Sequence, residues 1–402
     1  MAAYVDKSLL RSLFDQLPAR TQARLEEAVA RIVTARQRGG KVVVVTGSGP
    51  NLHEGVTTLI AELMRAGLVA GVTTSSAVVA HEMGGTLDRV KRCAGESLGL
   101  PTAILPRGGI FELSVMTDDA MQAVGRDVSI DWELVEKLKQ APGSTLIKAA
   151  GNLGYPMGLW VEQLAPEITG LAREHGRSFE EVAGLGADER TMIGIGARLG
   201  LPVVVTIPQL IGGGAVGLCI GDSLSLTERA GRLARLLDSA DVIIESGVAL
   251  TQEIHDGPLE TYTGHGLWSA WEGRYSYSLA GKTLVRIDLD PALEQVWEVE
   301  RGSGGVTRAI AEGLPKTKTF EVPFRMEMSG FARHEGSLPL VGELGGIWPL
   351  MAWKCAEALG IELQFLSYPQ QTGPGQAMRE EIVRDVKPLN RDRMREALRP
   401  TQ

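Results

Sequence analysis

The stretch Lys41-Val42-Val43-Val44-Val45-Thr46-Gly47-Ser48-Gly49-Pro50-Asn51-Leu52-His53-Glu54-Gly55 decides the fold of this chain. Its β-branched first part predicts a buried strand, and the glycines that follow predict a tight turn. An amphipathic helical pattern over residues 56–66 comes directly afterwards. This order places free backbone N–H groups and the positive end of a helix dipole where an anion can bind. We therefore interpret the stretch as the anion-binding turn of a nucleotide site.

A second unit of the same kind follows at once. Residues 71–77 form the strand and turn, and residues 78–85 carry His81 and Glu82 beside that turn. Two consecutive units predict a cleft for a nucleotide cofactor. The usual motifs are absent, because the turn lacks the third glycine of G-x-G-x-x-G and no Walker lysine follows. A plain α/β connection therefore remains the alternative.

Short apolar runs alternate with helical patterns along the rest of the chain. Further strands are expected at 201–208, 241–247 and 282–288, and helices at 159–174, 179–183, 188–199 and 226–240. This alternation predicts an α/β fold, with a Rossmann-like, mostly parallel sheet and helices on both faces. The carboxyl ends of parallel strands share one edge, where such sheets bind ligands. The turns at 46–55, 73–82, 208–217, 245–247 and 288–291 are therefore expected to form a single rim.

The remaining segments suggest three regions. Residues 1–38 form an N-terminal helical segment that covers a flank of the sheet or packs on another subunit, and 39–315 form the Rossmann-like domain. Within that domain, 93–144 is interpreted as loops and short helices. Residues 316–402 carry an antiparallel strand within 317–336, a helix at 348–359 and an extended arm that closes over a neighbouring subunit.

Composition narrows the possible functions. The 402 residues are 44% hydrophobic and 22% charged, as in ordinary globular proteins. The net charge of -8 argues against nucleic acid as a partner, since phosphate binding needs clustered Lys and Arg. No secretory signal is recognisable, and no apolar run approaches the roughly 18 residues of a membrane span. Three scattered cysteines suit neither a disulfide framework nor a zinc site, so we expect a cytoplasmic protein without a metal.

Several pieces of the chain, taken in order, resemble a known fold. The Gly40–Gly55 stretch and residues 75–82 resemble the deoxyhypusine-synthase-like NAD-binding fold. The later pieces are most similar to the archaeal-type ornithine cyclodeaminases, which also occur fused behind arginine dihydrolase domains. Those pieces are 175–183, 201–206, 240–244, 285–292 and 301–303. The likeness extends from about residue 39 to about residue 314.

The resemblance implies NAD as cofactor and a reaction that returns its hydride. In that reaction the α-carbon of ornithine is oxidised, the side-chain amine attacks the imine, ammonia leaves, and the hydride returns to give proline. Gly47 to Gly49 and the helix beginning near Glu54 would hold the pyrophosphate. The candidate cofactor residues of the whole rim are Gly47, Ser48, Gly49, Asn51, Ser75, Ser76, Gly213, Gly214, Glu245, Ser246, Asp288 and Asp290.

Four residues are candidates for the chemistry. His81 and Glu82 could form a general acid–base pair near the nicotinamide or substrate, or a helix-capping pair. Lys148 could receive a substrate carboxylate or act as a base, or be an exposed lysine. His255 could form a catalytic dyad with Asp256, or lie in a polar turn. His53, at the anion turn, is interpreted as structural or cofactor-contacting.

The chain also departs from the family pattern. Residues 210–214 read Leu-Ile-Gly-Gly-Gly where the cyclodeaminases have an Arg-Asp-Asp-Gly type turn, so a carboxylate for a diamine is missing. The aromatic residues of 257–281 have no match and could line a pocket, fill the core or form an interface. The Trp-Gly-Lys motif of deoxyhypusine synthase is absent, and Trp271-Glu272-Gly273-Arg274 is its nearest counterpart.

Three functions follow from these patterns. The first is an NAD-dependent, cyclodeaminase-like lyase that acts on an amino acid or amine by transient oxidation. The second is a deoxyhypusine- or homospermidine-synthase-like aminoalkyl transferase, and the third is a non-catalytic nucleotide-binding protein. Each implies a small-molecule ligand, and we expect a homo-oligomer, either dimer or tetramer. An acidic residue at the ribose end, Asp288, favours NAD over NADP.

Overall fold

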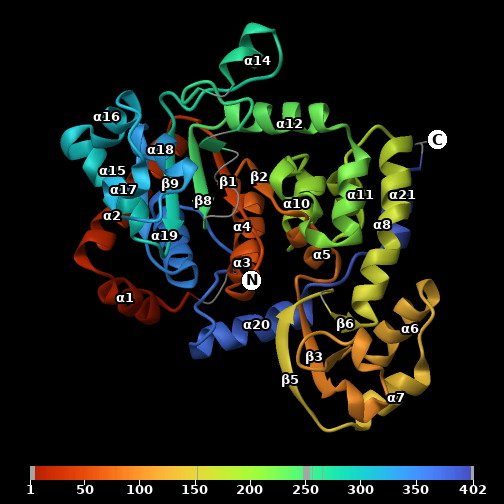
Figure 1. Cartoon of the computed structure of the whole chain (residues 1–402). Helices are drawn as coiled ribbons and strands as arrows, with labels where there is room; N and C mark the ends of the chain where they lie inside the picture. Colours follow the sequence, from red (N-terminus) through yellow and green to blue (C-terminus); the bar gives the residue numbers. More distant parts are fainter. Residues whose placement is uncertain (1–4, 152, 248–253, 256, 265, 400–402) are drawn as a thin grey trace.

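Six parallel strands form the central sheet of the protein (Figure 1). The computed structural model describes residues 5–399 except 152, 248–253, 256 and 265. The strands are β1 (Val42–Thr46), β2 (Gly71–Thr74), β7 (Val203–Val205), β8 (Val242–Ser246), β9 (Thr283–Asp288) and β10 (Ser337–Val341). The α/β class and the Rossmann-like parallel sheet predicted from the sequence are confirmed.

The strand order positions the candidate site. Across the sheet the order is β10-β9-β8-β1-β2-β7. Numbered along the chain, these six strands lie in the order 3-2-1-4-5-6 when read from β7, which is the doubly wound Rossmann order. The order reverses between β1 and β8, where Thr46 lies level with Ser246. Such sheets bind their ligand beyond the strand ends at this switch point.

Helices cover both faces of the sheet, as expected. The valines of β1 alternate between two cores, with Val42 and Val44 in one and Val43 and Val45 in the other. The first core includes residues of α2 (Ala19–Gln37), α4 (Val56–Arg65), α10 (Met192–Leu199) and α19 (Leu344–Leu359). The second includes residues of α12 (Leu226–Asp238), α15 (Ala292–Ser303) and α18 (Met326–Arg333). None of the helices in the described part of the chain is both long and apolar enough to span a bilayer.

A second, mixed sheet is inserted after β2, and the sequence did not predict it. It has the order β5-β3-β4-β6 and consists of β3 (Leu87–Ala94), β4 (Ile110–Ser114), β5 (Gly143–Ala149) and β6 (Gly154–Tyr155). The helices α6 (Asp118–Asp127) and α7 (Trp132–Gln140) pack against it. Within 93–144 the expected short helices are present, but the interpretation is wrong for β4 and for the ends of β3 and β5, which are strands. The strands are only half-buried, so no continuous apolar run marks them.

The N-terminal helices and the C-terminal region differ in how well they were predicted. Helices α1 (Lys7–Gln16) and α2 cover a flank of the sheet, as expected. The antiparallel strand expected within 317–336 is replaced by α17 (Lys316–Phe320) and α18, because Phe320 stacks on Phe324 and both pack onto a small helical core. The sixth strand, β10, lies beyond residue 315, so the boundary expected there cuts through the sheet.

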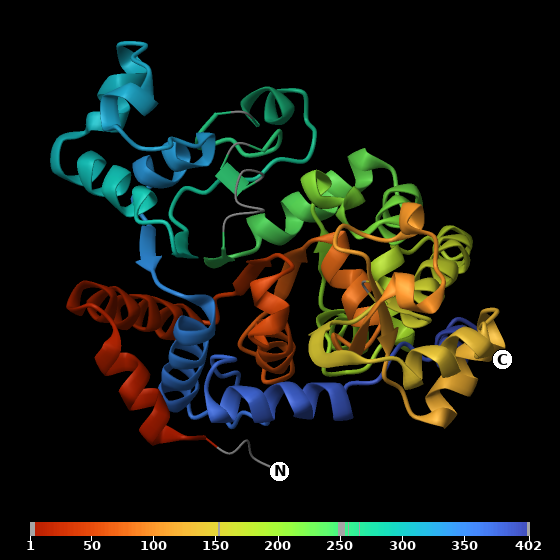
Figure 2. The same cartoon turned by 60° about the horizontal axis from the view of Figure 1, so that its bottom comes forward.

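The tail beyond residue 360 is helical and packs on its own chain. It contains α20 (Gly373–Asp385) and α21 (Arg391–Ala397) rather than an extended arm. Figure 2 shows α20, in deep blue, running from the N-terminal helices to the second sheet. Arg379 of α20 donates a hydrogen bond to the Ile147 carbonyl of β5 at 2.6 Å, and α21 packs on α9 (Phe179–Gly186).

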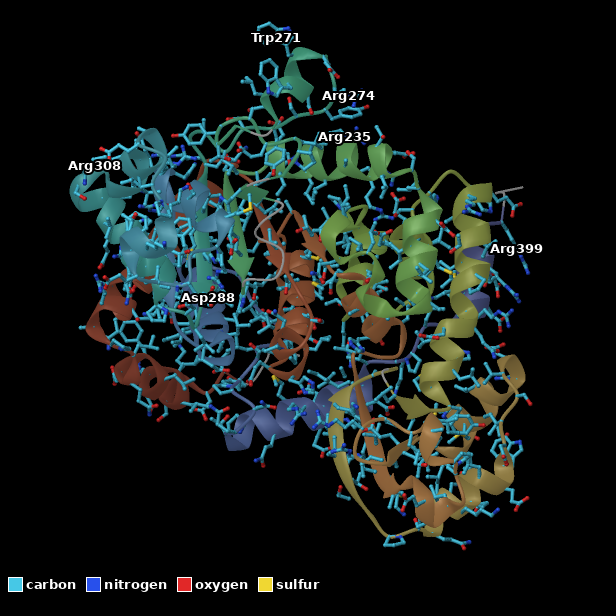
Figure 3. The ribbon with its side chains drawn as sticks, in the orientation of Figure 1. Arg235, Trp271, Arg274, Asp288, Arg308 and Arg399 are labelled. Carbon is cyan, nitrogen blue, oxygen red and sulfur yellow. The ribbon has the colours of Figure 1, made fainter. Side chains whose placement is uncertain are left out.

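The aromatic segment 257–281 divides between core and surface. Tyr277 is buried in the second core. Trp268 and Trp271 on α14 (Leu267–Trp271) are 67% and 79% exposed, and Figure 3 shows Trp271 at the outer tip of the molecule. His265 of this segment lies outside the described residues.

Candidate functional site

The carboxyl edge of the six-stranded sheet brings the candidate cofactor residues together. From β7 to β9, the loops at this edge carry Gly213 and Gly214, then Ser75 and Ser76, then Gly47, Ser48, Gly49 and Asn51, then Glu245 and Ser246, and finally Asp288 and Asp290. Neighbouring strands are about 4.8 Å apart, so the five loops extend over roughly 19 Å. One rim therefore runs along the strand ends, as the sequence predicts for a parallel sheet.

The turn after β1 is the most open part of this rim. Gly49 has φ +65°, a conformation that favours glycine, and a Cβ built on it meets no atom within 4 Å. Ser48 beside it is half-buried, and its hydroxyl makes no hydrogen bond with any described residue. A pyrophosphate could therefore approach this backbone closely and accept from the Ser48 hydroxyl.

The helix expected to hold the pyrophosphate does not begin directly after the glycine turn. The four-residue α3 (Pro50–His53) comes between the turn and α4, and Pro50 has no N–H to offer. The start of α4 is covered, since a Cβ on Gly55 would lie 2.7 Å from the Met378 sulfur of α20. Glu54 is buried and accepts a hydrogen bond from the Gln370 N–H at 2.8 Å. An anion at this edge would therefore meet Gly47 to Gly49, and the helix beginning near Glu54 is not open to it.

Asn51 and Ser246 close the switch point by bonding to each other. The Ser246 hydroxyl donates to Asn51 Oδ1 at 2.5 Å, and Asn51 Nδ2 donates to the Ser246 carbonyl at 3.3 Å. Trp348 Nε1 of α19 donates to the same hydroxyl at 2.7 Å. All three side chains are buried. They hold β1 and β8 in register at the rim. They would therefore position the backbone beside a ligand rather than bind the ligand themselves.

Ser75 and Ser76 shape the next part of the rim. The Ser75 hydroxyl caps α5 (Ser76–Met83) by accepting from the Val78 N–H. The Ser76 hydroxyl donates to the Gln209 carbonyl at 2.6 Å and accepts from the Gly213 N–H at 3.0 Å. These bonds tie the loop after β7 to the start of α5, and Gly213 leaves no room for a side chain against Ser76. Gly214 follows with φ +64°.

Asp288, at the end of β9, is already engaged by its neighbours. Its Oδ2 lies 3.3 Å from Arg286 Nη2 and 3.6 Å from Arg325 Nη2, and its Oδ1 accepts from the Asp290 N–H at 3.1 Å. Asp290 also pairs with Arg325, at 3.5 Å. Two guanidinium groups already pair with the Asp288 carboxylate. A ribose hydroxyl could therefore bind Asp288 only as a further partner of the same carboxylate.

Three candidate bases meet where the second sheet faces the rim. His53 ends α3, His81 lies in α5 and Lys148 lies in β5. Burial lowers the pKa of His53, and the charges of Arg379 and Lys148 and the His81 ring lower it further. Burial also lowers the pKa of His81, and the Lys148 charge adds to that effect. Both imidazoles are therefore held neutral near pH 7, so each can act as a base.

The bond to the backbone decides which nitrogen of His81 is available. Its Nδ1 lies 2.5 Å from the carbonyl oxygen of Ala150. A carbonyl can only accept, so the proton lies on Nδ1 and the lone pair lies on Nε2. His81 is half-buried, and the lone pair of Nε2 can take a proton from a bound molecule.

Carboxylates that the sequence analysis missed surround Lys148. Its Nζ donates to Glu112 Oε2 at 2.7 Å, and Glu112 also pairs with Arg92 at 3.0 Å. Asp88 lies opposite Lys148 in the β3–β5 ladder, and burial raises the pKa of Asp88 to about 6. Lys148 is thus an ion-paired, half-buried lysine. No sequence signal could have found Asp88 and Glu112, because the strands that carry them were not predicted.

Glu82 holds a helix rather than facing the rim. Its side chain is fully buried, and its two oxygens accept from the N–H groups of Met192 and Ile193 at 2.8 and 3.0 Å. These residues begin α10, whose dipole favours a carboxylate at that end. Burial nevertheless raises the pKa of Glu82 to about 7. Glu82 therefore caps the start of α10, which corresponds to the helix-capping alternative rather than to an acid–base role.

His255 lies on the other face of the sheet, apart from the three bases. Its Nε2 is 2.7 Å from Glu245 Oε1, and both side chains are fully buried. The ring packs edge-on against Phe331 of α18 in the second core. Asp256, the expected partner, lies outside the described residues. Among the residues that the structure describes, no group of three or more His, Cys, Asp or Glu is placed to hold a metal ion.

Comparison with known proteins finds similar structures but no similar sequences. No family model matches the chain, and no curated protein matches it in sequence. AgrE in complex with ornithine and NAD+ is 15% identical, with a TM-score of 0.41, and the match covers 85% of this chain and 34% of AgrE. The cyanobacterial arginine dihydrolase ArgZ is 14% identical, with a TM-score of 0.38, and the match covers 85% of this chain and 32% of ArgZ.

A third structure matches over more of its own length. A conserved putative LOR/SDH protein from Methanococcus maripaludis S2 is 10% identical, with a TM-score of 0.39, and the match covers 85% of this chain and 69% of that protein. The chain spans about one third of the length of AgrE and ArgZ.

Proposed function

We propose that the protein binds NAD along the carboxyl edge of its parallel sheet and uses it to oxidise a small amino acid or amine transiently. The observation that carries this proposal is the position of Gly47-Ser48-Gly49 at the switch point between β1 and β8. The open space beside Gly49 and the Ser48 hydroxyl, which bonds to none of the described residues, fit a pyrophosphate. Bound NAD would supply a hydride acceptor that the protein's own side chains lack.

The bases facing the rim suit the chemistry of an amine substrate. Removing a hydride from a carbon that bears an amine requires that the amine first lose its proton, and neutral His81 can accept that proton at Nε2. Arg379 lies close enough to His53 to affect its pKa, so it adds positive charge beside it, whereas the charge of Lys148 is balanced by Glu112. A substrate carboxylate would be attracted to Arg379. We propose an α-amino acid as substrate, with ornithine-like cyclisation and loss of ammonia as the reaction.

Neither alternative function gains support from the site. The nearest counterpart of a Trp-Gly-Lys motif, residues 271–274, begins at the exposed end of α14, and its fourth residue is Arg274. A non-catalytic nucleotide-binding protein would need no bases beside the rim, whereas the neutral imidazoles of His53 and His81 lie together there.

Three measurements test the proposal. The supernatant of the heat-denatured protein is assayed for NAD, and calorimetry with NAD and NADP measures affinity in wild type and in Gly49→Val. We expect NAD to bind, and the valine to weaken binding by at least about tenfold, because its side chain fills the space for the pyrophosphate. Ammonia release from L-ornithine and other amino acids, without net NADH, then tests the reaction. Absence of heat with both coenzymes contradicts the proposal, and NAD binding without turnover of any amino acid supports the non-catalytic alternative.

A further inference from the structure

The aromatic segment 257–281 carries an exposed pair of tryptophans. Trp268 and Trp271 on α14 are both exposed, and their ring centroids lie 6.0 Å apart. Leu267 and Tyr275 beside them are exposed as well. Tryptophan is strongly buried on average in globular proteins, and clustered apolar groups on a surface mark interaction sites. These four side chains form what we name the aromatic tip of the chain.

An apolar pocket lies over the same face of the sheet as the aromatic tip. It has a volume of about 330 Å³ and lies between α15, α16 (Gly305–Ala311) and α17. Val299 and Leu314 in its wall are 38% and 40% exposed, so the pocket opens to the surface. Its other apolar walls are formed by Val296, Ala309, Phe320 and Val322. Residues of α15 share the second core with Tyr277 of the aromatic segment, which places the pocket and the tip over one face of the sheet.

The walls of this pocket carry the groups that an indole ring needs. Phe320 can pack against an aromatic ring, and the side chains of Gln295 and Thr319 offer oxygens that can accept the indole N–H. Arg308 also lines the pocket, and among the described residues its guanidinium donates only to the Ser303 carbonyl, at 3.4 Å. A guanidinium that lies over an indole face is attracted to it. The pocket therefore fits a tryptophan better than an aliphatic side chain.

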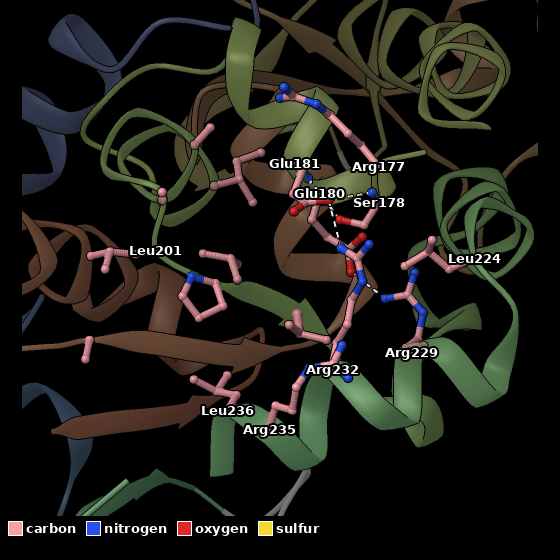
Figure 4. A pocket seen from close by; sticks show the side chains of 18 of the residues that line it. Arg177, Ser178, Glu180, Glu181, Leu201, Leu224, Arg229, Arg232, Arg235 and Leu236 are labelled. Atoms are coloured by element: carbon pink, nitrogen blue, oxygen red, sulfur yellow. Dashed lines mark hydrogen bonds and ion pairs between the residues drawn. The ribbon is translucent and has the colours of Figure 1, made fainter. Parts of the chain in front are cut away.

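A larger cavity of the chain does not suit an aromatic ring. It has a volume of about 750 Å³ and lies beside α9, α10 and α12, at the amino ends of the strands. Figure 4 shows its wall, where Arg229 and Arg232 of α12 extend toward Glu180 and Glu181 of α9. An indole in this cavity would desolvate the partly exposed Glu181 and Arg232 without offering them a new partner. The apolar pocket is therefore the better site for the aromatic tip.

The aromatic tip does not fill the pocket of its own chain. Trp268 and Trp271 are exposed, and Figure 3 shows Trp271 and Arg308 at separate points of the molecular outline. We infer that the aromatic tip inserts into the apolar pocket of a second copy of this chain, and that the second copy's tip inserts into the pocket of the first. Trp271, the more exposed ring, enters the pocket, and Trp268 covers its mouth. This reciprocal arrangement forms a closed dimer with two identical contacts.

Two such contacts bury enough surface for a stable dimer. A buried tryptophan covers about 150–250 Å² of surface. Four rings, two from each tip, would therefore bury about 600–1,000 Å², and the pocket walls that cover them would bury a similar area. The total lies within the usual range of specific interfaces, about 1,200–2,000 Å². The inference does not depend on the proposed function, because neither the tip nor the pocket includes a residue of the rim at the carboxyl edge.

Sedimentation equilibrium of the full chain tests the inference. We expect the wild type to be a dimer at micromolar concentration, and Trp268→Ala/Trp271→Ala to raise the dimer dissociation constant by at least about thirtyfold, as for other central interface tryptophans. Val299→Asp should act similarly, because its carboxylate would lie in the path of the indole ring. Two matched controls should dimerise as the wild type does. Trp132→Ala removes an exposed tryptophan from α7, and Ile310→Asp adds a carboxylate to α16 outside the pocket.

A mixture of the two variants shows whether tips meet pockets. The tip variant keeps an intact pocket and Val299→Asp keeps an intact tip, so a mixed pair retains one of the two contacts. We expect the mixture to contain more dimer than either variant alone at the same total concentration. If Val299→Asp lowers the melting temperature, Arg308→Glu, an exposed change in the same wall, takes its place.

Four results would overturn the inference. They are a monomeric wild type, a tip or pocket variant that dimerises as tightly as the wild type, a control that loses the dimer as the variants do, and a mixture that behaves as the sum of its two components. Dimerisation of the pocket variant alone would show that tips pack on tips rather than in pockets.

Discussion

Replacing Glu82 with glutamine separates a structural role of this carboxylate from a catalytic one. Glu82 is fully buried, and its oxygens accept from the N–H groups of Met192 and Ile193 at the start of α10. Glutamine has the same shape and one carbonyl oxygen, but it does not ionise. Because the side chain is enclosed by α10, we expect Glu82→Gln to retain whatever turnover the wild type shows.

The shifted pKa of Glu82 determines how strongly the unfolding free energy depends on pH. Burial raises the pKa of Glu82 to about 7, from an ordinary value of 4.5. The folded protein therefore holds this proton more tightly than the unfolded chain does, so the stabilisation is complete below the ordinary pKa and is lost as the pH rises through 7. Between pH 5 and pH 8 these two pKa values correspond to a loss of about 2.5 kcal/mol of unfolding free energy in the wild type. The glutamine variant has no such loss.

Urea unfolding at pH 5, 6, 7 and 8 measures this difference. The wild type and Glu82→Gln are compared at each pH, so that other titrating groups cancel, and Glu174→Gln on the exposed end of α8 (Met157–Glu174) serves as the control. The wild type should lose stability relative to Glu82→Gln as the pH rises, and Glu174→Gln should follow the wild type. A constant difference from pH 5 to pH 8 would refute the reasoning, because the two N–H bonds and the helix dipole would then outweigh burial.

Three further substitutions test the rim and the bases beside it. Gly49→Ala should lower the unfolding free energy by about 1–3 kcal/mol, as measured by urea unfolding, because φ +65° with ψ −119° is a conformation that side-chain-bearing residues rarely adopt. His81→Gln should reduce turnover by about 10²–10⁴-fold in a steady-state assay of ammonia release, while the exposed His175→Gln should not. Asn51→Ala should destabilise the protein by about 1–3 kcal/mol in the same unfolding assay, because the buried Ser246 hydroxyl loses its acceptor.

The central sheet could be predicted because its strands are buried on both faces. Val42–Thr46 and Val242–Ser246 are fully buried, and such strands read as continuous apolar runs that end abruptly at the next turn. The position of the rim could be predicted once these strands were recognised, because parallel strands that alternate with helices all end at one edge of the sheet. The second sheet could not be predicted in this way. In Leu87–Ala94 the charged residues come in pairs, Asp88-Arg89 and Lys91-Arg92, so the strict alternation of a half-buried strand is missing and the pattern is equally that of a loop.

The structure brings the predicted rim residues to one edge of the sheet, but the bonds that their side chains make could not be predicted. The sequence places Ser76, Ser246 and Asp288 at the rim, but it does not say what each side chain bonds to. All three bond to other parts of the protein, through the Gln209 carbonyl, Asn51 and Arg286 respectively. Such partners lie 2 to 195 positions away in the chain, and only the folded geometry selects among them. Glycines of the rim are different, because their role depends on the backbone alone.

The bases come together because the unpredicted second sheet lies against the predicted rim. Lys148 reaches His53 and His81 only because β5 packs near α3, and α20 then holds β5 through the bond from Arg379 to Ile147. The part of the site that binds a cofactor thus belongs to a regular sheet, whose periodicity is visible in the sequence. The part proposed to face a substrate is built from a half-buried strand and a C-terminal helix, which pack by side-chain shape. In the proposed function, substrate choice would therefore depend on the elements that sequence patterns define least, and cofactor binding on those that they define best.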